Sequence, residues 1–140
     1  MTEPRSAPVV VVGVDGSPAA ERALEWATAY AESTGASLRV VCAWALPTSF
    51  GRPVPHEGYE PAAAARQVTE KAVAGLGLPA DRVETLVPVG SAGEVLVDVS
   101  KDADLLVVGR HGHRTIVSHL LGSVSSYCAH HAQVPLVVIH

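Results

Sequence analysis

Short apolar runs alternate with longer amphipathic segments along the whole chain. The runs are rich in Val, Leu and Ile and are bounded by Gly, Pro, Asp or Ser, a pattern typical of β-strands. They cover Val9–Val14, Ser37–Trp44, Arg82–Val89, Ala103–Gly109 and Pro135–His140. We therefore expect five strands with helical segments between them.

The ends of the intervening segments carry helix signals. The first opens with Ser17 as N-cap and a proline behind it, and Gly35 ends it. Its apolar stripe has spacings of three and four and comprises Ala20, Ala23, Leu24, Ala27, Tyr30 and Ala31. The other helices are expected over Pro61–Leu76, from a capping box at Ser91–Glu94 that precedes Val95, Leu96 and Val99, and from about Gly122 to His131.

Strands that alternate with helices predict parallel pairing through right-handed crossovers, with helices on both faces of the sheet. The near-continuous apolar runs at Val9–Val12 and Asp104–Val108 indicate central strands. The stretch 82–88 alternates polar with apolar residues and contains a proline, so it belongs at an edge. The fold class is thus an open five-stranded parallel α/β sheet of order 3-2-1-4-5. Such sheets bind ligands where strand order reverses, here just after Val14 and Val108.

The chain length of 140 residues suits one domain, residues 1–140. The polar, proline-containing start, residues 1–7, is expected to be flexible. Residues 45–60 are rich in Pro and Gly and lack periodicity, so we expect a long mobile loop on the rim that carries the predicted site.

Composition narrows the range of functions. Hydrophobic residues make up 48% and charged residues 17%, which excludes a disordered or fibrous chain. A net charge of −4 offers no footprint for nucleic acid or an anionic membrane. Neither a signal peptide nor a bilayer-spanning stretch is recognisable, so we expect a cytoplasmic protein. Cys42 and Cys128 lie in apolar stretches and are interpreted as buried, reduced thiols.

Glycine-bearing turns follow both of the strands that meet at the predicted switch point. Glycine lets the backbone approach an anion, and a helix N-terminus adds unpaired amides and a positive dipole end. Asp15 is poorly suited to touch phosphate, but it could accept from ribose hydroxyls or help to hold Mg²⁺. Each residue alone is more often a simple turn or cap; their convergence favours a nucleotide site. The turns comprise Gly13, Val14, Asp15, Gly16 and Ser17 after the first strand, and Gly109, Arg110, His111, Gly112, Gly122, Ser123, Val124 and Ser125 after the fourth.

Other nucleotide motifs are absent. The chain has no G-x-x-x-x-G-K-[ST] and no G-x-G-x-x-G after its first strand, which argues against a P-loop and a dinucleotide-binding domain.

The motifs resemble those of the universal stress protein family over about residues 8–140. Members that bind ATP carry G-x2-G-x9-G-[ST], and this spacing is met by Gly109, Gly112, Gly122 and Ser123. The opening Val-Val-Gly-Val-Asp-Gly-Ser, which ends at Ser17, also matches. The resemblance implies a Rossmann-like fold of the adenine nucleotide α-hydrolase-like kind.

The resemblance also implies a role for each matched position. Asp15 would contact the ribose or adenine end above a floor of Gly13 and Val14, and Val41 would meet the adenine edge through its backbone. Gly109 and Gly112 would approach the ribose and phosphates. The phosphates would be cradled by Gly122, Ser123, Val124 and Ser125, with Arg110 in a variable position beside them. The implied ligand is ATP, with Mg²⁺ left open.

The expected role is an ATP-dependent stress-response regulator that acts on an unidentified protein partner. Pro135–His140 would form an apolar edge strand, and pairing with a second copy of the chain would cover it. The resemblance implies the same, because members of that family are often dimers through this strand. A slow ATP hydrolase or autophosphorylating enzyme, and an interaction module without nucleotide, are the alternatives. No catalytic constellation is recognisable, and the spacing of the histidines does not suit a metal site. Trp26 and Trp44 are expected to pack in the core or at the rim.

Overall fold

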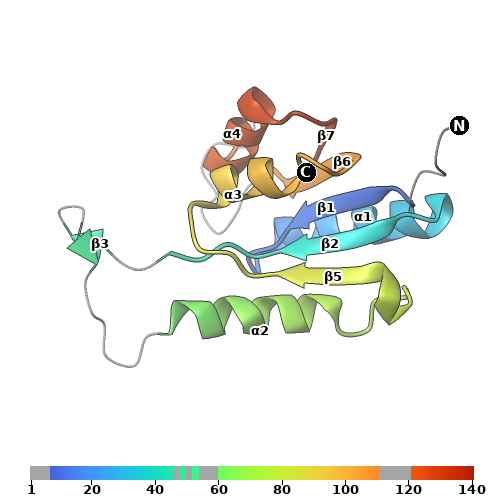
Figure 1. Ribbon diagram of the computed structural model, residues 1–140, viewed down its shortest axis with the longest axis horizontal. Coiled ribbons are helices and arrows are strands. Elements are labelled where there is room, and N and C mark those ends of the chain that lie inside the picture. Colours follow the sequence, from blue (N-terminus) through green and yellow to red (C-terminus); the bar gives the residue numbers. More distant parts are fainter. Residues whose placement is uncertain (1–6, 46–47, 50–51, 54–59, 111–120) are drawn as a thin grey trace, which may run out of the picture.

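The computed structural model describes residues 7–45, 48–49, 52–53, 60–110 and 121–140. A parallel sheet of five strands has the order β5-β2-β1-β6-β7 (Figure 1). Strands β3 (Thr48–Ser49) and β4 (Arg52–Pro53) form a separate small ribbon. Without them β5, β6 and β7 are the third, fourth and fifth strands along the chain, so the order is the predicted 3-2-1-4-5. The strands of the main sheet are β1 (Val9–Gly13), β2 (Ser37–Val41), β5 (Val83–Leu86), β6 (Leu105–Gly109) and β7 (Leu136–Ile139).

Burial along the strands explains this order. Val10, Val11 and Val12 in β1 and Val107 in β6 are fully buried, as central strands between two helical layers must be. Strand β5 lies at one edge and exposes Glu84. The strands are shorter than predicted, because apolar residues continue beyond the paired segments into the turns at the rim.

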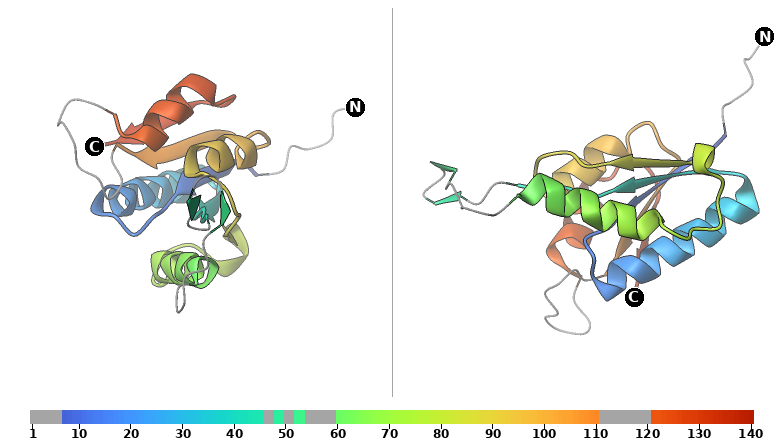
Figure 2. Two further views of the ribbon diagram at one scale, coloured as in Figure 1. Left: turned by 90° about the vertical axis from the view of Figure 1, so that its left-hand side faces the viewer. Right: turned by 90° about the horizontal axis from the view of Figure 1, so that it is seen from below.

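The helices cover both faces of the sheet, and Figures 1 and 2 show the two layers. Helices α1 (Pro18–Thr34) and α2 (Pro61–Val73) pack on one face, and α3 (Ala92–Val99) and α4 (Ser123–His131) pack on the other. Alternate residues of β1 contribute to the two cores: Val10 and Val12 belong to the first, and Val11 belongs to the second. A short 3₁₀ helix, η1 (Ala80–Arg82), leads into β5.

Helix α1 begins and ends at the predicted residues. The Ser17 hydroxyl accepts a hydrogen bond from the Ala20 amide, and Gly35 ends the helix at φ 75°, a conformation that favours glycine. The predicted apolar stripe is buried except for Tyr30, which is 38% exposed and stacks on Trp26. The inclusion of Tyr30 and the core or rim role of Trp26 were therefore wrong, because this part of the helix surface faces solvent.

Two other helix boundaries differ from expectation. Helix α2 ends at Val73 rather than Leu76. Helix α3 has Ser91 as N-cap, but the predicted capping box is not formed, because the Ser91 side chain makes no cap hydrogen bond. Ser91 is exposed, so water can satisfy the first amides of this helix.

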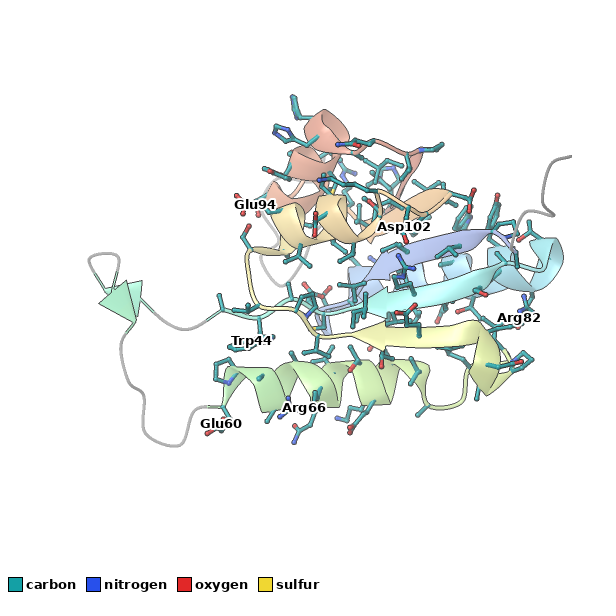
Figure 3. The ribbon with its side chains drawn as sticks, viewed as in Figure 1. Trp44, Glu60, Arg66, Arg82, Glu94 and Asp102 are labelled. Carbon is teal, nitrogen blue, oxygen red and sulfur yellow. The ribbon has the colours of Figure 1, made fainter. Side chains whose placement is uncertain are left out.

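The segment between β2 and α2 contains more structure than a plain loop. Strands β3 (Thr48–Ser49) and β4 (Arg52–Pro53) form a two-stranded antiparallel ribbon, which the lack of periodicity had not predicted. The expected mobility of residues 45–60 concerns a segment that lies partly outside the described residues, as the expected flexible start mostly does. Trp44 extends toward the beginning of α2, packs against the core and donates to the Val87 carbonyl at 3.0 Å, as its predicted packing role requires (Figure 3).

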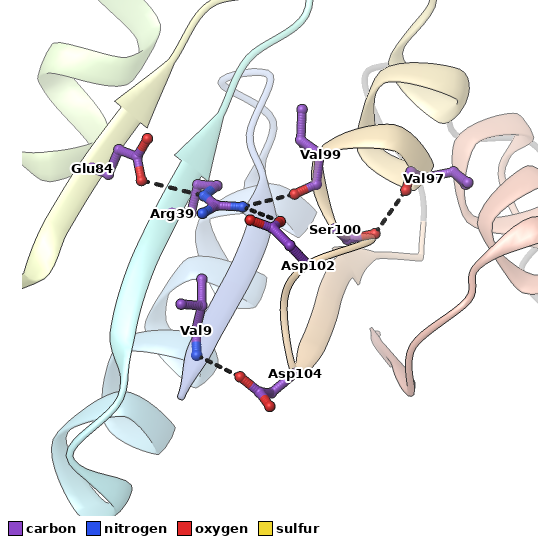
Figure 4. A network of polar contacts seen from close by, with 8 residues as sticks. All are labelled: Val9, Arg39, Glu84, Val97, Val99, Ser100, Asp102 and Asp104. Carbon is purple, nitrogen blue, oxygen red and sulfur yellow. Dashed lines mark hydrogen bonds and ion pairs between the residues drawn. The ribbon is translucent and has the colours of Figure 1, made fainter. Parts of the chain in front are cut away.

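A polar network joins β2, the edge strand and the end of α3 (Figure 4). The Arg39 guanidinium donates to the Val99 carbonyl at 2.8 Å and to the Asp102 carboxylate at 2.9 Å, and it pairs with Glu84 at 3.3 Å. The Arg39 hydrogen bond and charge lower the pKa of Asp102. This network fixes the C-terminal end of α3 over the sheet, and thereby the position of its first turn at the opposite rim.

Among the described residues, no helix combines the length and the apolarity that crossing a membrane requires.

Candidate functional site

A pocket of about 350 Å³ opens where β1 and β6 end, at the predicted switch point. Its volume lies at the lower end of the range of small-molecule sites in proteins. Its walls come from three adjacent strands and from the first turns of α1, α3 and α4. The lining residues are Gly13, Val14, Asp15, Ser17, Ala20, Val41, Ala43, Ala92, Leu96, Val108, Gly109, Arg110, Gly122, Ser123, Val124 and Ser125.

Every predicted site residue within the described part of the chain lines this pocket. The remaining predicted residue, Gly112, is not among the described residues. The apolar wall formed by Ala43, Ala92 and Leu96 was not among the predicted parts of the site. Helical periodicity assigned Leu96 to the core, where it is indeed 4% exposed, but periodicity does not show that a core side chain also faces a cavity.

The turn after β1 is closed by its own polar groups. Gly16 has φ 82°, which explains a glycine there. The Asp15 carboxylate accepts from the Ser17 amide at 2.9 Å, and the buried Ser17 hydroxyl in turn accepts from Ala20. These bonds hold Asp15 at the pocket mouth and close the start of α1.

Two of the glycines are required by packing inside the protein. A Cβ at Gly109 would lie 2.8 Å from the carbonyl carbon and oxygen of Ala19, so β6 approaches the backbone of α1 too closely for any side chain. A Cβ at Gly13 would lie 2.7 Å from Leu96 Cδ1, the end of a side chain that can move. These two glycines were predicted to let the backbone approach an anion. They are also required by close packing against α1 and Leu96.

The N-terminus of α4 is open. Its N-cap is Gly122, which has no side chain to cap the helix. Within the described residues no group accepts from the amides of Ser123 or Val124, which both line the pocket. Unpaired amides and the positive end of a helix dipole favour an anion at this wall.

Ser125 is one of the four residues that the family resemblance places around the phosphates. The side chain is buried, and its hydroxyl donates to the carbonyls of Arg110 at 2.9 Å and Gly122 at 3.1 Å. The Gly122 amide also donates to the Arg110 carbonyl at 2.8 Å. In this structure Ser125 holds the end of β6 against the start of α4 and thereby positions the open amides.

Arg110 places a guanidinium beside the pocket. Its amide donates to the Ile139 carbonyl at 2.7 Å, and its Nη1 lies 3.1 Å from His140 Nδ1. Its Nε is buried and has no partner among the described residues. Arg110 therefore lines the pocket, while its Nη1 contacts His140, which is not a lining residue.

The family resemblance gives the backbone of Val41 in β2 a contact with the adenine edge. The Val41 carbonyl already accepts from the Val14 amide at 2.9 Å. Ala43 lies just beyond the strand, lines the pocket, and its amide has no partner among the described residues. The free backbone amide on this wall thus belongs to Ala43 and not to a residue inside the ladder.

The cysteines have the predicted burial. Both are free thiols, and burial raises the pKa of Cys128 to about 11 and also raises the pKa of Cys42, with a smaller contribution from the Asp15 charge. Neither thiol lines the pocket. In the described ranges no three His, Cys, Asp or Glu side chains gather as a metal site would need; His111, His113 and His119 lie outside them.

Comparisons with known proteins agree with this geometry. The family model for the universal stress protein family matches residues 8–140. The universal stress protein Rv2623 of Mycobacterium tuberculosis is 39% identical over 141 residues, which cover 94% of this chain and 47% of that protein. The chain therefore spans about half the length of the curated relatives it matches.

Solved structures extend the comparison. A universal stress protein in complex with cAMP is 32% identical, with a TM-score of 0.67 and coverage of 96% of this chain and 98% of that one. The universal stress protein of Archaeoglobus fulgidus in complex with dAMP is 26% identical, with a TM-score of 0.70 and the same coverage of both chains. Sequence and fold thus agree along nearly the whole chain, which belongs to the universal stress protein family.

Proposed function

We propose that the chain binds an adenine nucleotide, with ATP preferred, in the pocket between β1 and β6, and acts as a nucleotide-dependent regulator. The observation that carries the proposal is that one cavity is lined by a helix N-terminus with no cap among the described residues, by an arginine and by an apolar wall. Phosphates need the first two and a purine base needs the third. The cAMP and dAMP complexes of similar proteins support an adenine nucleotide as the ligand class.

The residues divide the pocket into two ends. At the phosphate end, the amides of Ser123 and Val124 would donate to phosphate oxygens, with Gly122 and Gly109 leaving room for them. Arg110 would add charge, and Ser125 would hold the turn. The proposed phosphate contact of Gly112 rests on its match to the family motif, because Gly112 is not among the described residues.

At the base end, Ala43, Ala92 and Leu96 would contact the purine ring together with Val41 and Val14. The Ala43 amide would donate to the adenine edge, in place of the Val41 backbone. Asp15 at the mouth would accept from ribose hydroxyls or, if Mg²⁺ accompanies the triphosphate, hold the ion through water.

Binding without efficient turnover is favoured over hydrolysis. Among the described residues that line the pocket, Asp15 is the one carboxylate, and it accepts from the Ser17 amide. The described part of the lining thus offers no second acid to hold a metal ion or orient a water. The alternatives are a slow hydrolase or autophosphorylating enzyme, and an interaction module that binds no nucleotide.

Calorimetric titration with ATP, ADP, AMP and cAMP, followed by a phosphate-release assay, separates these functions. The regulator requires binding without release, the enzyme requires release well above a trace, and the interaction module requires no binding. A gain in affinity with each added phosphate would support the preference for ATP.

A substitution at the N-cap of α4 tests the phosphate assignment. Gly122 has φ −69° and ψ 170°, a conformation that any residue adopts, so Gly122→Val should leave the fold intact. A branched side chain there should screen the amides and weaken ATP binding about a hundredfold, or about 2.7 kcal/mol. Gly122→Ala is the graded control, and its ATP affinity should lie between those of the parent chain and of Gly122→Val. Parental affinity in the Val variant, measured by calorimetry on protein with an unchanged circular dichroism spectrum, would contradict the assignment.

Pairing of a second copy along β7 stays a prediction. Support comes from the position of β7 at the sheet edge, where all four of its residues are only half-buried.

A further inference from the structure

A second hollow lies between α1 and α2, on the face of the sheet opposite α3 and α4. It is a groove of about 680 Å³, larger than the pocket between β1 and β6. Figure 2 shows the two helices side by side on this face of the sheet. The floor is apolar, and Leu24 from α1 faces Val68, Ala72 and Leu76 from α2 and the turn after it.

The α1 wall of this groove is acidic. Glu21, Glu25 and Glu32 all line it, and they recur at intervals of four and seven residues, so they project from one side of the helix. All three are exposed, and within the described ranges none of them makes an ion pair. The Glu32 carboxylate lies over Gly77, where a Cβ would come within 2.7 Å of its Oε1.

Of the described residues that line the opposite wall, one carries a charge of the other sign, the exposed Lys71. An apolar floor between an acidic wall and a wall with a single lysine fits a particular kind of occupant. Such a segment needs an apolar stripe for the floor and Lys or Arg along the side that faces α1. A groove between two helices accepts a third helix by the helix-in-groove mode, in which anchors recur at i, i+3, i+4 and i+7.

We propose that this groove docks a basic amphipathic helix of a protein partner. Charge complementarity with Glu21, Glu25 and Glu32 would select and orient the helix, and the partly exposed Val68, Ala72 and Leu76 would contact its apolar stripe. Val14 and Ala20 line both this groove and the pocket between β1 and β6, so the two sites share a wall. The docking itself does not depend on the proposed nucleotide function.

The test uses the whole chain without nucleotide, so its outcome is independent of the nucleotide proposal. The probe is a fluorescent amphipathic peptide of about 18 residues, roughly the length of α1, with leucines at helical spacing and lysines beside them. A second peptide with glutamate in place of each lysine has the same apolar stripe. The basic peptide should bind at least about tenfold more tightly by fluorescence anisotropy, and added salt should weaken it.

Variants locate the contact. Glu21→Lys combined with Glu25→Lys should weaken the basic peptide about tenfold. Glu70→Lys combined with Glu94→Lys makes the same change in net charge at exposed positions outside the groove and should change the affinity less than about twofold. Amide chemical shifts in a ¹⁵N NMR titration should move along α1 and α2 and not along α3 and α4.

Three results would overturn the proposal: no binding of the basic peptide up to about 1 mM, equal affinity for the two peptides, or an equal effect of the two double variants. A fourth would be concentration-dependent shifts of the same amides without peptide, because the occupant would then be a second copy of the chain.

Discussion

Helices α1 and α4 both begin at the rim of the pocket, and their N-termini differ in whether side chains cap them. At α1 the polar side chains accept from the first amides: the Asp15 carboxylate accepts from the Ser17 amide, and the Ser17 hydroxyl accepts from the Ala20 amide. Pro18 follows and has no amide hydrogen to satisfy. This helix end is closed by the chain itself.

At α4 the corresponding position is Gly122, which has no side chain, and Ser125 directs its hydroxyl back to carbonyls. In the part of the chain that the structure describes, no group accepts from the amides of Ser123 and Val124 at the pocket wall. Both termini carry the positive end of a helix dipole, so the dipole alone does not choose between them. The availability of the amides does, and this difference places the phosphates at α4 in the proposed function.

The largest effect on stability is expected from a side chain at Gly109, where β6 contacts the first turn of α1. Gly109→Ala places a Cβ 2.8 Å from the Ala19 backbone in the first turn of α1, which has to shift. We expect a loss of about 3 kcal/mol in the free energy of unfolding, measured by urea denaturation.

Gly13→Ala is the matched control on the neighbouring strand. Its Cβ meets the movable end of Leu96, so the loss of stability should be smaller. The displaced Leu96 would instead fill part of the pocket and lower nucleotide affinity. Equal losses of stability in the two variants would show that contact with backbone is not the deciding factor.

Removing the cap of α1 should have an intermediate effect on stability. Ser17→Ala leaves the Ala20 amide buried without a partner and should cost about 1–2 kcal/mol in thermal or urea unfolding. The affinity for ATP should change less than about twofold, because the closed terminus provides no amide to phosphate. A loss of affinity as large as that of Gly122→Val would end the contrast between the two termini.

Removing the buried hydroxyl behind α4 should have the smallest effect on stability. Ser125→Ala deletes the bonds to the Arg110 and Gly122 carbonyls and should cost about 1 kcal/mol in urea unfolding. ATP affinity should fall severalfold, because the turn that presents the amides loosens. Ser123→Ala removes an exposed hydroxyl and keeps its amide, so it serves as the comparison. A larger loss of affinity in Ser123→Ala than in Ser125→Ala would show that the hydroxyl of Ser123, and not the turn, holds the phosphate.

Much of the fold was predictable because its signals are local. The apolar runs of β1 and β6 marked central strands, the polar alternation at 82–88 marked an edge, and the Ser17 and Gly35 signals bounded α1. Chain connectivity then leaves few ways to assemble alternating strands and helices, so the switch point followed from strand order. The pocket residues were predictable for the same reason, since they follow strands that had to be neighbours.

The misses have a common cause in three-dimensional surroundings. Tyr30 has helical spacing but faces solvent, and Ser91 has the cap sequence but makes no cap bond. The phosphate role of Ser125 stays a prediction, and in the structure its buried hydroxyl donates to carbonyls of the neighbouring turn. In each case the residue type permits the predicted contact, and only the neighbours show which group the side chain meets.

The order of the strands and the rim at which two glycine-bearing turns meet can be predicted from the chain alone, because periodicity and connectivity are properties of the chain. Packing was needed to show that Ser17 caps α1 while no described residue caps α4, that a Cβ at Gly109 would meet the backbone of α1, and that an acidic groove lies between α1 and α2. Hydrogen bonds and close contacts depend on which atoms lie within about 3 Å of each other, and that distance is set by packing between segments far apart in the chain.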